Sequence, residues 1–164
     1  MGVKSRFLVV DDHPVFRQGL VALIHSDPAF RVTAEAGNTD DALKALEREE
    51  PDIALIDISL ENENGLDLVR SIHSSNPSLP ILIISMHDES VYAERALKAG
   101  ARGLVMKHEA PSEVLSAIRT VLSGRIYLSD AMRDRLLQSM ITSQREGEFA
   151  LVDRLTERET EVLE

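Results

Sequence analysis

Five short apolar runs recur along the chain at a steady interval, and they constrain its fold more than any other feature. They are FLVV from Phe7, RVTAEA from Arg31, IALI from Ile53, ILII from Ile81 and GLVM from Gly103. Four of the five are continuous rather than alternating, which is typical of strands buried on both faces of a parallel sheet. The runs therefore predict five parallel strands.

A segment with helical spacing of apolar residues follows each run. The first segment places on one face Val15, Phe16, Leu20, Leu23 and Ile24. Pro14 suits the first turn of that helix, and Gly100 and Gly124 suit the ends of the fourth and fifth helices. Strands and helices that alternate in this way, joined by right-handed crossovers, predict an α/β fold. We expect a doubly wound five-stranded parallel sheet of order 2-1-3-4-5, which is flavodoxin-like.

Composition excludes several classes of protein. The chain has 164 residues, 28 acidic against 18 basic, and a formal net charge of -10, which argues against binding nucleic acid or an anionic membrane by bulk charge. Because it has no cysteine, disulfides and thiolate metal sites are excluded. Its apolar runs are far shorter than the roughly 20 residues that span a bilayer, and its N-terminus lacks a signal-peptide pattern. We expect a cytoplasmic protein without a membrane partner.

The pattern changes after Gly124. The segment SDAMRDRLLQSM predicts a separate amphipathic helix, TSQREGEF is typical of a linker, and LTERETEVLE begins another helix. We therefore expect one α/β domain over residues 1–126 and a linker helix and loop over 127–154. Residues 155–164 would be the start of a further domain.

Charged or polar residues stand at the carboxyl ends of four of the five predicted strands. Strand 1 is followed by Asp11 and Asp12, strand 3 ends in Asp57, strand 4 ends in Ser85, and strand 5 is followed by Lys107. In the order 2-1-3-4-5 these four ends are neighbours, whereas the edge strand ends in a glycine. Each residue alone is explained as a surface or capping residue. Their common placement at the edge formed by the carboxyl ends of the strands, the mouth of the sheet, indicates a site.

The chemistry of this set favours phosphoryl transfer. Three carboxylates held together repel one another unless a cation lies between them, and oxygen ligands without His or Cys favour Mg²⁺. Mg²⁺ beside a lysine neutralises phosphoryl oxygens, so one carboxylate can act as nucleophile and form an aspartyl phosphate. We infer that Asp11 and Asp12 hold a metal that the chemistry at Asp57 requires, and that Ser85 donates its hydroxyl to the phosphoryl group.

Four motifs carry a resemblance to a known family. VVDDHP, DIALIDISLENENGLDL, ILIISMHDE and KAGARGLVMK, with their spacing across residues 6–124, resemble the receiver domain of two-component response regulators, more narrowly the NarL/FixJ (LuxR-type) transcription factors. LTERETEVL is similar to the first turns of that family's C-terminal helix-turn-helix. The resemblance implies a phosphorylation-dependent regulator rather than an enzyme. It implies a receiver domain over residues 1–126, and over 155–164 only the truncated start of the DNA-binding domain.

The resemblance also implies roles for single residues. Asp57 would be the phosphoacceptor, and a sensor histidine kinase would donate the phosphoryl group. Mg²⁺ would be bound by Asp12 and Asp57, with the Ser59 main-chain carbonyl as a further ligand and Asp11 acting mostly through water. A homodimer is compatible with the resemblance. DNA contact is expected only through the missing part of the helix-turn-helix domain, where transcription would be controlled.

The switch region departs from the family pattern. Ser85 and Lys107 would be the residues that sense and bind the phosphoryl oxygens. Many receivers carry Tyr or Phe three residues before that lysine, and Leu104 stands there, so an aromatic rotation cannot be the readout. Glu61 replaces a frequent proline after the phosphoacceptor, and His108 replaces a frequent cis proline after the lysine.

The histidines are further candidates for site residues, because imidazole is a common metal ligand. His87 lies two residues past Ser85, and both His87 and Ser59 are candidate gates for water that reaches the phosphoryl group. The remaining histidines show no metal-ligand spacing and are expected to be surface or capping residues: His13, His25, His73 and His108.

Three other functions compete with this one. A phosphatase of the haloacid dehalogenase type also uses an Asp nucleophile and Mg²⁺, but it needs a second Asp two residues later, where Ser59 stands. A receiver that binds only partner proteins fits a chain ending at Glu164, whereas LTERETEVL argues for DNA as the output. A flavin or nucleotide binder would need a glycine-rich phosphate loop after strand 1, and the sequence has none there.

Overall fold

Five parallel strands form one sheet in the order β2-β1-β3-β4-β5, as the apolar runs predicted. The computed structural model describes residues 3–60, 64–86 and 89–143. The strands are β1 (Ser5–Val10), β2 (Phe30–Ala36), β3 (Ile53–Asp57), β4 (Ile81–Ser85) and β5 (Gly103–Met106). Every residue of β3, β4 and β5 is buried, which explains why these strands are continuous apolar runs rather than alternating ones.

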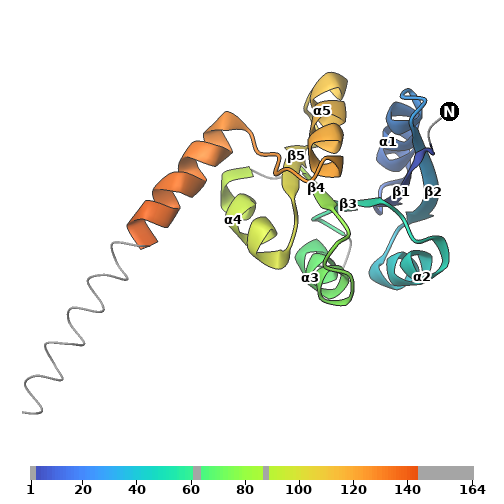
Figure 1. Cartoon of the computed structure of the whole chain (residues 1–164), viewed down its shortest axis with the longest axis horizontal. Coiled ribbons are helices and arrows are strands. Elements are labelled where there is room, and N and C mark those ends of the chain that lie inside the picture. The colour runs from blue at the N-terminus through green and yellow to red at the C-terminus, as the bar shows by residue number, and fades with distance from the viewer. Residues whose placement is uncertain (1–2, 61–63, 87–88, 144–164) are drawn as a thin grey trace, which may run out of the picture. The chain divides into compact units, whose positions relative to one another are not determined.

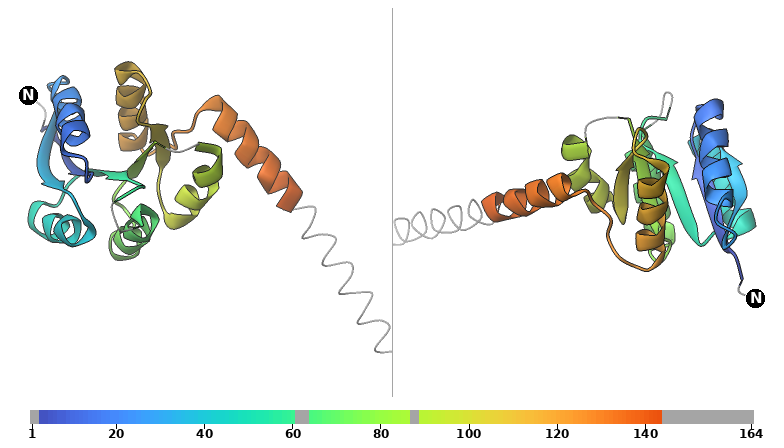
Figure 2. Two further views of the ribbon diagram at one scale, coloured as in Figure 1. Left: turned by 180° about the vertical axis from the view of Figure 1, so that it is seen from behind. Right: turned by 90° about the horizontal axis from the view of Figure 1, so that it is seen from above.

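A helix follows each strand and returns the chain to the amino end of the sheet. The helices are α1 (Pro14–His25), α2 (Thr39–Glu49), α3 (Gly65–Ser75), α4 (Glu89–Ala99) and α5 (Pro111–Leu122). Helices α1 and α5 cover one face of the sheet, and α2, α3 and α4 cover the other (Figure 1). The two further views in Figure 2 agree with this arrangement. The predicted doubly wound α/β fold is confirmed.

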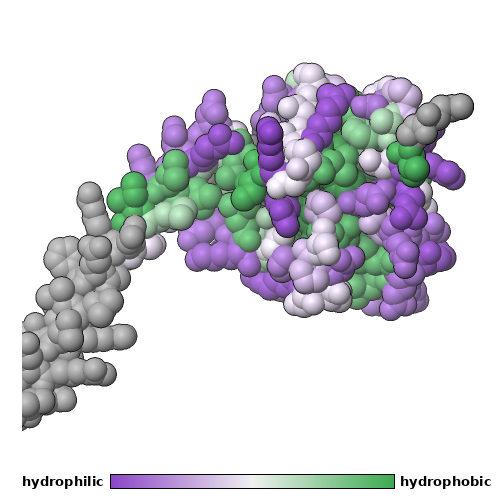
Figure 3. All heavy atoms as spheres, viewed as in Figure 1, coloured by the Kyte–Doolittle hydropathy of each residue, from purple (hydrophilic) through white to green (hydrophobic). Residues whose placement is uncertain are grey.

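The core lies between the sheet and its helices. On the face covered by α1 and α5, one cluster joins Phe7, Val9, Leu55, Leu82, Ile84 and Val105 of the strands to Leu20, Ile24, Val114, Ile118 and Val121 of the helices. Hydrophilic side chains cover most of the visible outer surface of the helices (Figure 3). In α1 the helical spacing predicted this division, except that Val15 is exposed. Val15 lies in the first turn of α1, past the carboxyl end of β1, where the sheet does not cover it.

Polar side chains and one glycine fix the helix ends. Asn38 and Asn64 each accept a hydrogen bond from a main-chain N–H in the first turn of α2 and α3. After α4, Gly100 has a φ of 115°, and a Cβ at that position would overlap the ring of His73. Only glycine is compatible with both conditions, so the predicted C-cap role of Gly100 is confirmed.

The chain divides into two units, Met1–Ser129 and Asp130–Glu164. In the first unit the main chain of Tyr127 pairs with Gly103 beside β5, which covers one edge of the sheet. In the second unit, residues 130–143 are helical, where SDAMRDRLLQSM predicted a helix. The predicted linker loop and the start of the last helix lie outside the described residues. No helix among the described residues is long and apolar enough to cross a membrane.

Candidate functional site

The site forms because four strand ends share one edge of the sheet. Asp57, the last residue of β3, pairs with Ile84 of β4, and Ser85, the last residue of β4, pairs with Met106 of β5. The main-chain N–H of Lys107 donates to the carbonyl of Ser85 at 2.8 Å. Parallel pairing in this register brings the residues that end β1, β3, β4 and β5 to the same mouth, as the predicted strand order required.

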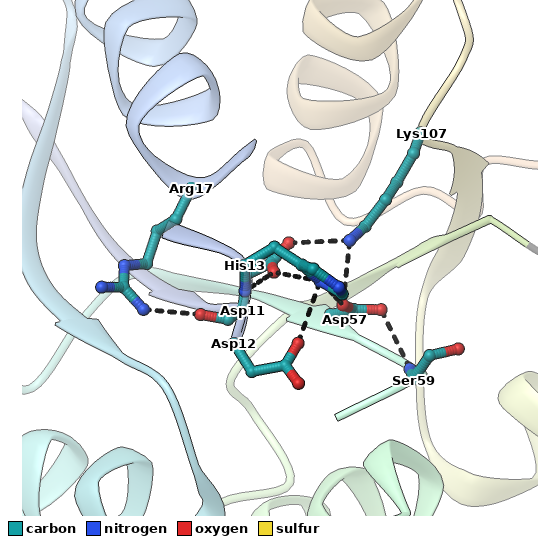
Figure 4. A network of polar contacts seen from close by, with 7 residues as sticks. All are labelled: Asp11, Asp12, His13, Arg17, Asp57, Ser59 and Lys107. Carbon is teal, nitrogen blue, oxygen red and sulfur yellow. Dashed lines mark hydrogen bonds and ion pairs between the residues drawn. The ribbon is translucent and has the colours of Figure 1, made fainter. Parts of the chain in front are cut away.

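Asp57 is held in place through both of its carboxylate oxygens (Figure 4). Its Oδ2 accepts a hydrogen bond from Lys107 Nζ at 2.9 Å, and its Oδ1 accepts one from the main-chain N–H of Ser59 at 2.9 Å. The side chain is buried, and it projects from the central strand of the sheet. A buried carboxylate is unfavourable unless charge and hydrogen bonds compensate it, and these two donors provide that compensation.

Asp11 is a second buried carboxylate in contact with the same lysine. Its Oδ1 accepts a hydrogen bond from the main-chain N–H of His13 at 2.7 Å. Its Oδ2 lies 3.0 Å from Lys107 Nζ, close enough for an ion pair, but it accepts no hydrogen bond within the described part of the chain. Asp11 therefore presents a buried oxygen toward the mouth with coordination capacity to spare.

Asp12 and His13 form the side of the cluster nearest to solvent. His13 Nδ1 lies 3.0 Å from Asp12 Oδ1, 3.4 Å from Asp11 Oδ1 and 3.8 Å from Asp57 Oδ2. His13 is the N-cap residue of α1, yet its side chain makes no capping hydrogen bond. His13 is exposed, as expected of a surface histidine, but its ring also lies against the carboxylates (Figure 4).

These residues fit a divalent cation. One ligand atom from each of Asp11, Asp12, His13 and Asp57 can be chosen so that all four lie within 4.8 Å of one another. Three carboxylates lie around a single ammonium group, that of Lys107, so the acidic side chains of the cluster outnumber its lysine by two. Oxygen-rich sites of this kind suit hard divalent ions.

Lys107 is fixed by three different contacts. Its Nζ bridges Asp57 and Asp11, and it also lies 4.3 Å from the centre of the Phe16 ring. A cation over an aromatic face is stabilised by the ring quadrupole, more strongly when water is excluded. Helical spacing predicted Phe16 only as a core residue. Its contact with the lysine depends on how the first turn of α1 lies relative to the residue that follows β5, which local spacing does not specify.

Arg17 and Gly65 also support the site and were not predicted. Arg17 Nη1 donates to the carbonyl of Asp11 at 2.6 Å, and its Nε donates to Glu35 Oε1 at 3.2 Å. A Cβ on Gly65 would lie 2.5 Å from the carbonyl oxygen of Asp57, so only glycine allows α3 to begin this close to β3. The sequence does place Arg17 one helical turn after His13, and this spacing could have predicted its contact with Asp11.

The remaining predicted residues occupy different surroundings. Ser85 is buried at the end of β4, next to the strand that carries Asp57. Leu104 is fully buried inside β5, so the position that is often aromatic is here part of the core. The peptide bond before His108 is not cis. His87 and Glu61 lie outside the described residues.

Comparison with known proteins identifies relatives. Residues 7–119 match the family described as the response regulator receiver domain. The transcriptional regulatory protein DegU of Brevibacillus brevis is 28% identical over 135 residues, 82% of this chain and 57% of DegU. The response regulator UvrY of Escherichia coli (strain K12) is 32% identical over 157 residues, 95% of this chain and 71% of UvrY. The chain thus spans about 57% to 71% of the length of these relatives.

A solved structure supports the same assignment. The two-component response regulator of the LuxR family from Aurantimonas sp. SI85-9A1 has a TM-score of 0.78 and 33% sequence identity. The similarity covers 84% of this chain and 99% of that one. The family predicted from the four motifs is confirmed. The relatives are regulators, so the alternative of a haloacid dehalogenase-type phosphatase is not supported.

Proposed function

The chain belongs to the response regulators of two-component signalling, and on that premise we propose that its receiver domain is switched by phosphorylation of Asp57. The setting of Asp57 carries the proposal. It is a buried carboxylate at the end of the central strand, 2.9 Å from a lysine and close to two further aspartates. We propose a sensor histidine kinase as the donor and the cytoplasm as the place of reaction.

The chemical step is an attack by a carboxylate oxygen of Asp57 on the phosphorus of a phosphohistidine. The new O–P bond forms while the N–P bond breaks, and the leaving imidazole nitrogen keeps the electron pair. Lys107 offers positive charge beside the attacking carboxylate, while the main-chain N–H of Ser59 holds the other carboxylate oxygen. The chain thus orients the nucleophile and supplies part of the charge that phosphoryl transfer needs.

Asp11, Asp12 and Asp57 are the residues that would hold Mg²⁺, with the main-chain carbonyl of Ser59 as a further ligand. When bound, Mg²⁺ would neutralise charge on the phosphoryl oxygens. The fit rests on the separation of the ligand atoms and on the Asp11 oxygen that accepts no hydrogen bond. Arg17 and His13 each bond to Asp11 and hold its carbonyl and carboxylate in position.

Ser85 and Lys107 are the proposed sensors of phosphorylation. A phosphoryl group adds negative charge and three acceptor oxygens at Asp57. Ser85 ends the neighbouring strand and Lys107 follows the next one, so movement of either residue is transmitted to β4 and β5. Because Leu104 is aliphatic and buried, the readout would depend on main-chain movement of these strands rather than on the rotation of an aromatic ring.

The output is proposed to be control of transcription in a longer protein. UvrY and DegU are named as regulators, and this chain spans only part of each. We propose that DNA is bound through a helix-turn-helix domain that begins at residues 155–164, and that homodimerisation accompanies activation. A receiver that acts only through protein partners remains the competing proposal, and DNA binding by the longer protein distinguishes the two.

Labelling with a small phosphodonor tests the acceptor. The chain is incubated with acetyl phosphate and Mg²⁺, and its intact mass is measured. Wild type should gain one phosphoryl group and Asp57→Asn none. Asp52→Asn is the matched control, because Asp52 precedes the same strand at its exposed amino end and should leave labelling unchanged. Labelling of Asp57→Asn, or no labelling of wild type, would reject the proposal.

A further inference from the structure

His13 has a place in the acidic cluster that the proposed phosphorylation chemistry does not use. We propose that His13 Nδ1 is a direct ligand of the divalent cation held by Asp11, Asp12 and Asp57. This inference rests on the proposed metal site. A nitrogen donor at that position would make the site bind Co²⁺ and other later transition metals more tightly, relative to Mg²⁺, than a site of oxygen ligands alone.

The distances around His13 match those of a coordination shell. In an octahedral site with metal–ligand distances of about 2.1 Å, neighbouring ligand atoms lie about 3.0 Å apart and opposite ones about 4.2 Å apart. His13 Nδ1 lies 3.0, 3.4 and 3.8 Å from oxygens of Asp12, Asp11 and Asp57. All three separations fall between those limits, which places the nitrogen within reach of a cation held by these oxygens.

The main chain directs the imidazole toward the cluster. The N–H of His13 donates to Asp11 Oδ1 at 2.7 Å, and Pro14 starts α1 directly afterwards. Pro14 fixes its own φ and restricts the backbone of the residue before it. The side chain of His13 makes no capping hydrogen bond, so Nδ1 is not committed to the helix. The side chain is 59% exposed, so it lies on the solvent side of the cluster.

The chemical type of the donor atom decides which metal ion binds more tightly. Carboxylate and carbonyl oxygens suit Mg²⁺, whereas imidazole suits the later first-row ions, whose affinities rise from Mn²⁺ through Co²⁺ to Cu²⁺. A single nitrogen among oxygens leaves Mg²⁺ binding possible. It shifts the ratio of affinities rather than excluding one ion.

The test replaces the nitrogen donor by an oxygen donor. His13→Asn keeps a residue that is favoured at an N-cap, so the start of α1 is preserved. His108→Asn is the matched control, because His108 is an exposed histidine that follows Lys107. Two quantities are measured for wild type and both variants. They are the ¹⁴N coupling of bound Mn²⁺ by pulsed electron paramagnetic resonance, and the Co²⁺ and Mg²⁺ affinities by calorimetry.

Wild type and His108→Asn should show imidazole ¹⁴N coupling to Mn²⁺, and His13→Asn should lose it. The ratio of Co²⁺ to Mg²⁺ affinity should fall about tenfold in His13→Asn alone. Coupling that is absent from wild type, coupling that persists in His13→Asn, or an unchanged affinity ratio would each overturn the inference.

Phosphorylation of the same samples separates this inference from the proposed function. Wild type labelled on Asp57 with Mg²⁺ but lacking ¹⁴N coupling would overturn the role of His13 and leave the function intact. Absence of labelling together with absence of bound Mn²⁺ would overturn both. Labelling of wild type with ¹⁴N coupling that depends on His13 supports both.

Discussion

The two ends of the sheet carry similar ion pairs in opposite surroundings. At the amino end, Arg6 and Asp52 lie 3.7 Å apart, with side chains 44% and 46% exposed. At the carboxyl end, Lys107 lies 2.9 Å from Asp57, with side chains 6% and 1% exposed. Exposed pairs contribute about 0–1 kcal/mol, while burying charges costs several kcal/mol per ion before their attraction is counted. Stability alone does not explain why charge is buried at one end only.

The two ends also differ in their balance of charge. The amino-end pair has one acid for one base, and the main-chain N–H of Arg6 donates to the Asp52 carboxylate as well. The carboxyl end sets Lys107 against Asp57 and Asp11, with Asp12 beside them. The amino end is therefore complete without a ligand, whereas the carboxyl end gains from an added cation. This difference identifies the functional end of the sheet without reference to relatives.

Removing the buried lysine should have the largest effect on stability. Lys107→Met keeps most of the apolar stem but leaves the carboxylates of Asp57 and Asp11 without their cation. Without divalent metal, we expect the free energy of unfolding to fall by about 3 kcal/mol, because an uncompensated buried charge remains. Saturating Mg²⁺ should recover part of this loss. Urea unfolding measured with chelator and with Mg²⁺ gives both values.

The matched change at the amino end is Arg6→Met. Its effect should stay within about 1 kcal/mol, because the Arg6–Asp52 pair is exposed and Asp52 remains hydrated. Mg²⁺ should not alter the effect. If the Lys107 and Arg6 variants lost equal free energy of unfolding, the two ends of the sheet would not differ in the energetics of their ion pairs.

Backbone packing at the carboxyl end should give the next largest effect. Gly65→Ala places a Cβ against the carbonyl of Asp57, and overpacking of this kind costs about 2 kcal/mol. It should also slow labelling by acetyl phosphate, because the end of β3 must shift. Gly19→Ala is the control, since a Cβ there meets nothing within 4 Å. It should stabilise α1 by about 0.5–1 kcal/mol with unchanged labelling. Stability and labelling rate that do not differ between the two variants would contradict this account.

Sequence reasoning was strongest where local pattern and topology agree. Continuous apolar runs specified β3 and β4, and parallel pairing then placed Asp57 and Ser85 at one mouth without knowledge of any side-chain direction. It was weakest where a side chain has more than one favourable direction. An N-cap residue such as His13 can turn its ring toward the helix or away from it, and only the folded positions of the carboxylates decide. Val15 fitted the helical face by spacing, but the sheet ends before it.

The contact of Phe16 with Lys107 should contribute a smaller amount. Phe16→Leu retains apolar packing but removes the aromatic face that lies 4.3 Å from the ammonium. A double-mutant cycle with Lys107→Met should give a coupling free energy of about 1 kcal/mol, measured by urea unfolding. Coupling near zero would mean that Phe16 is only a core residue, as its spacing first indicated. The pair Phe16→Leu and Arg6→Met is the control, because Arg6 lies at the other end of the sheet. The changes that these two substitutions cause in the free energy of unfolding should be additive.

Asp27→Asn, on the amino side of the sheet, is expected to change the free energy of unfolding least. Asp27 Oδ1 accepts a hydrogen bond from the main-chain N–H of Ala29 at 2.9 Å, and Arg119 donates to its Oδ2 at 3.2 Å. The Ala29 hydrogen bond, helped by Arg119, lowers the pKa of Asp27 below its usual 3.8. A depressed folded pKa means that the stabilisation is fully present above the unfolded pKa, and that it is lost as the pH falls through the folded value.

The difference in free energy of unfolding between wild type and Asp27→Asn should therefore be constant from pH 7 to about pH 5 and shrink below about pH 4. Added salt should reduce it, because Arg119 is exposed. Urea unfolding of both proteins across this range measures the difference. A difference that grows as the pH falls would have the wrong sign for a depressed pKa. At the carboxyl end the decisive variable is instead the divalent cation, so addition of Mg²⁺ at constant pH should leave the Asp27 difference unchanged.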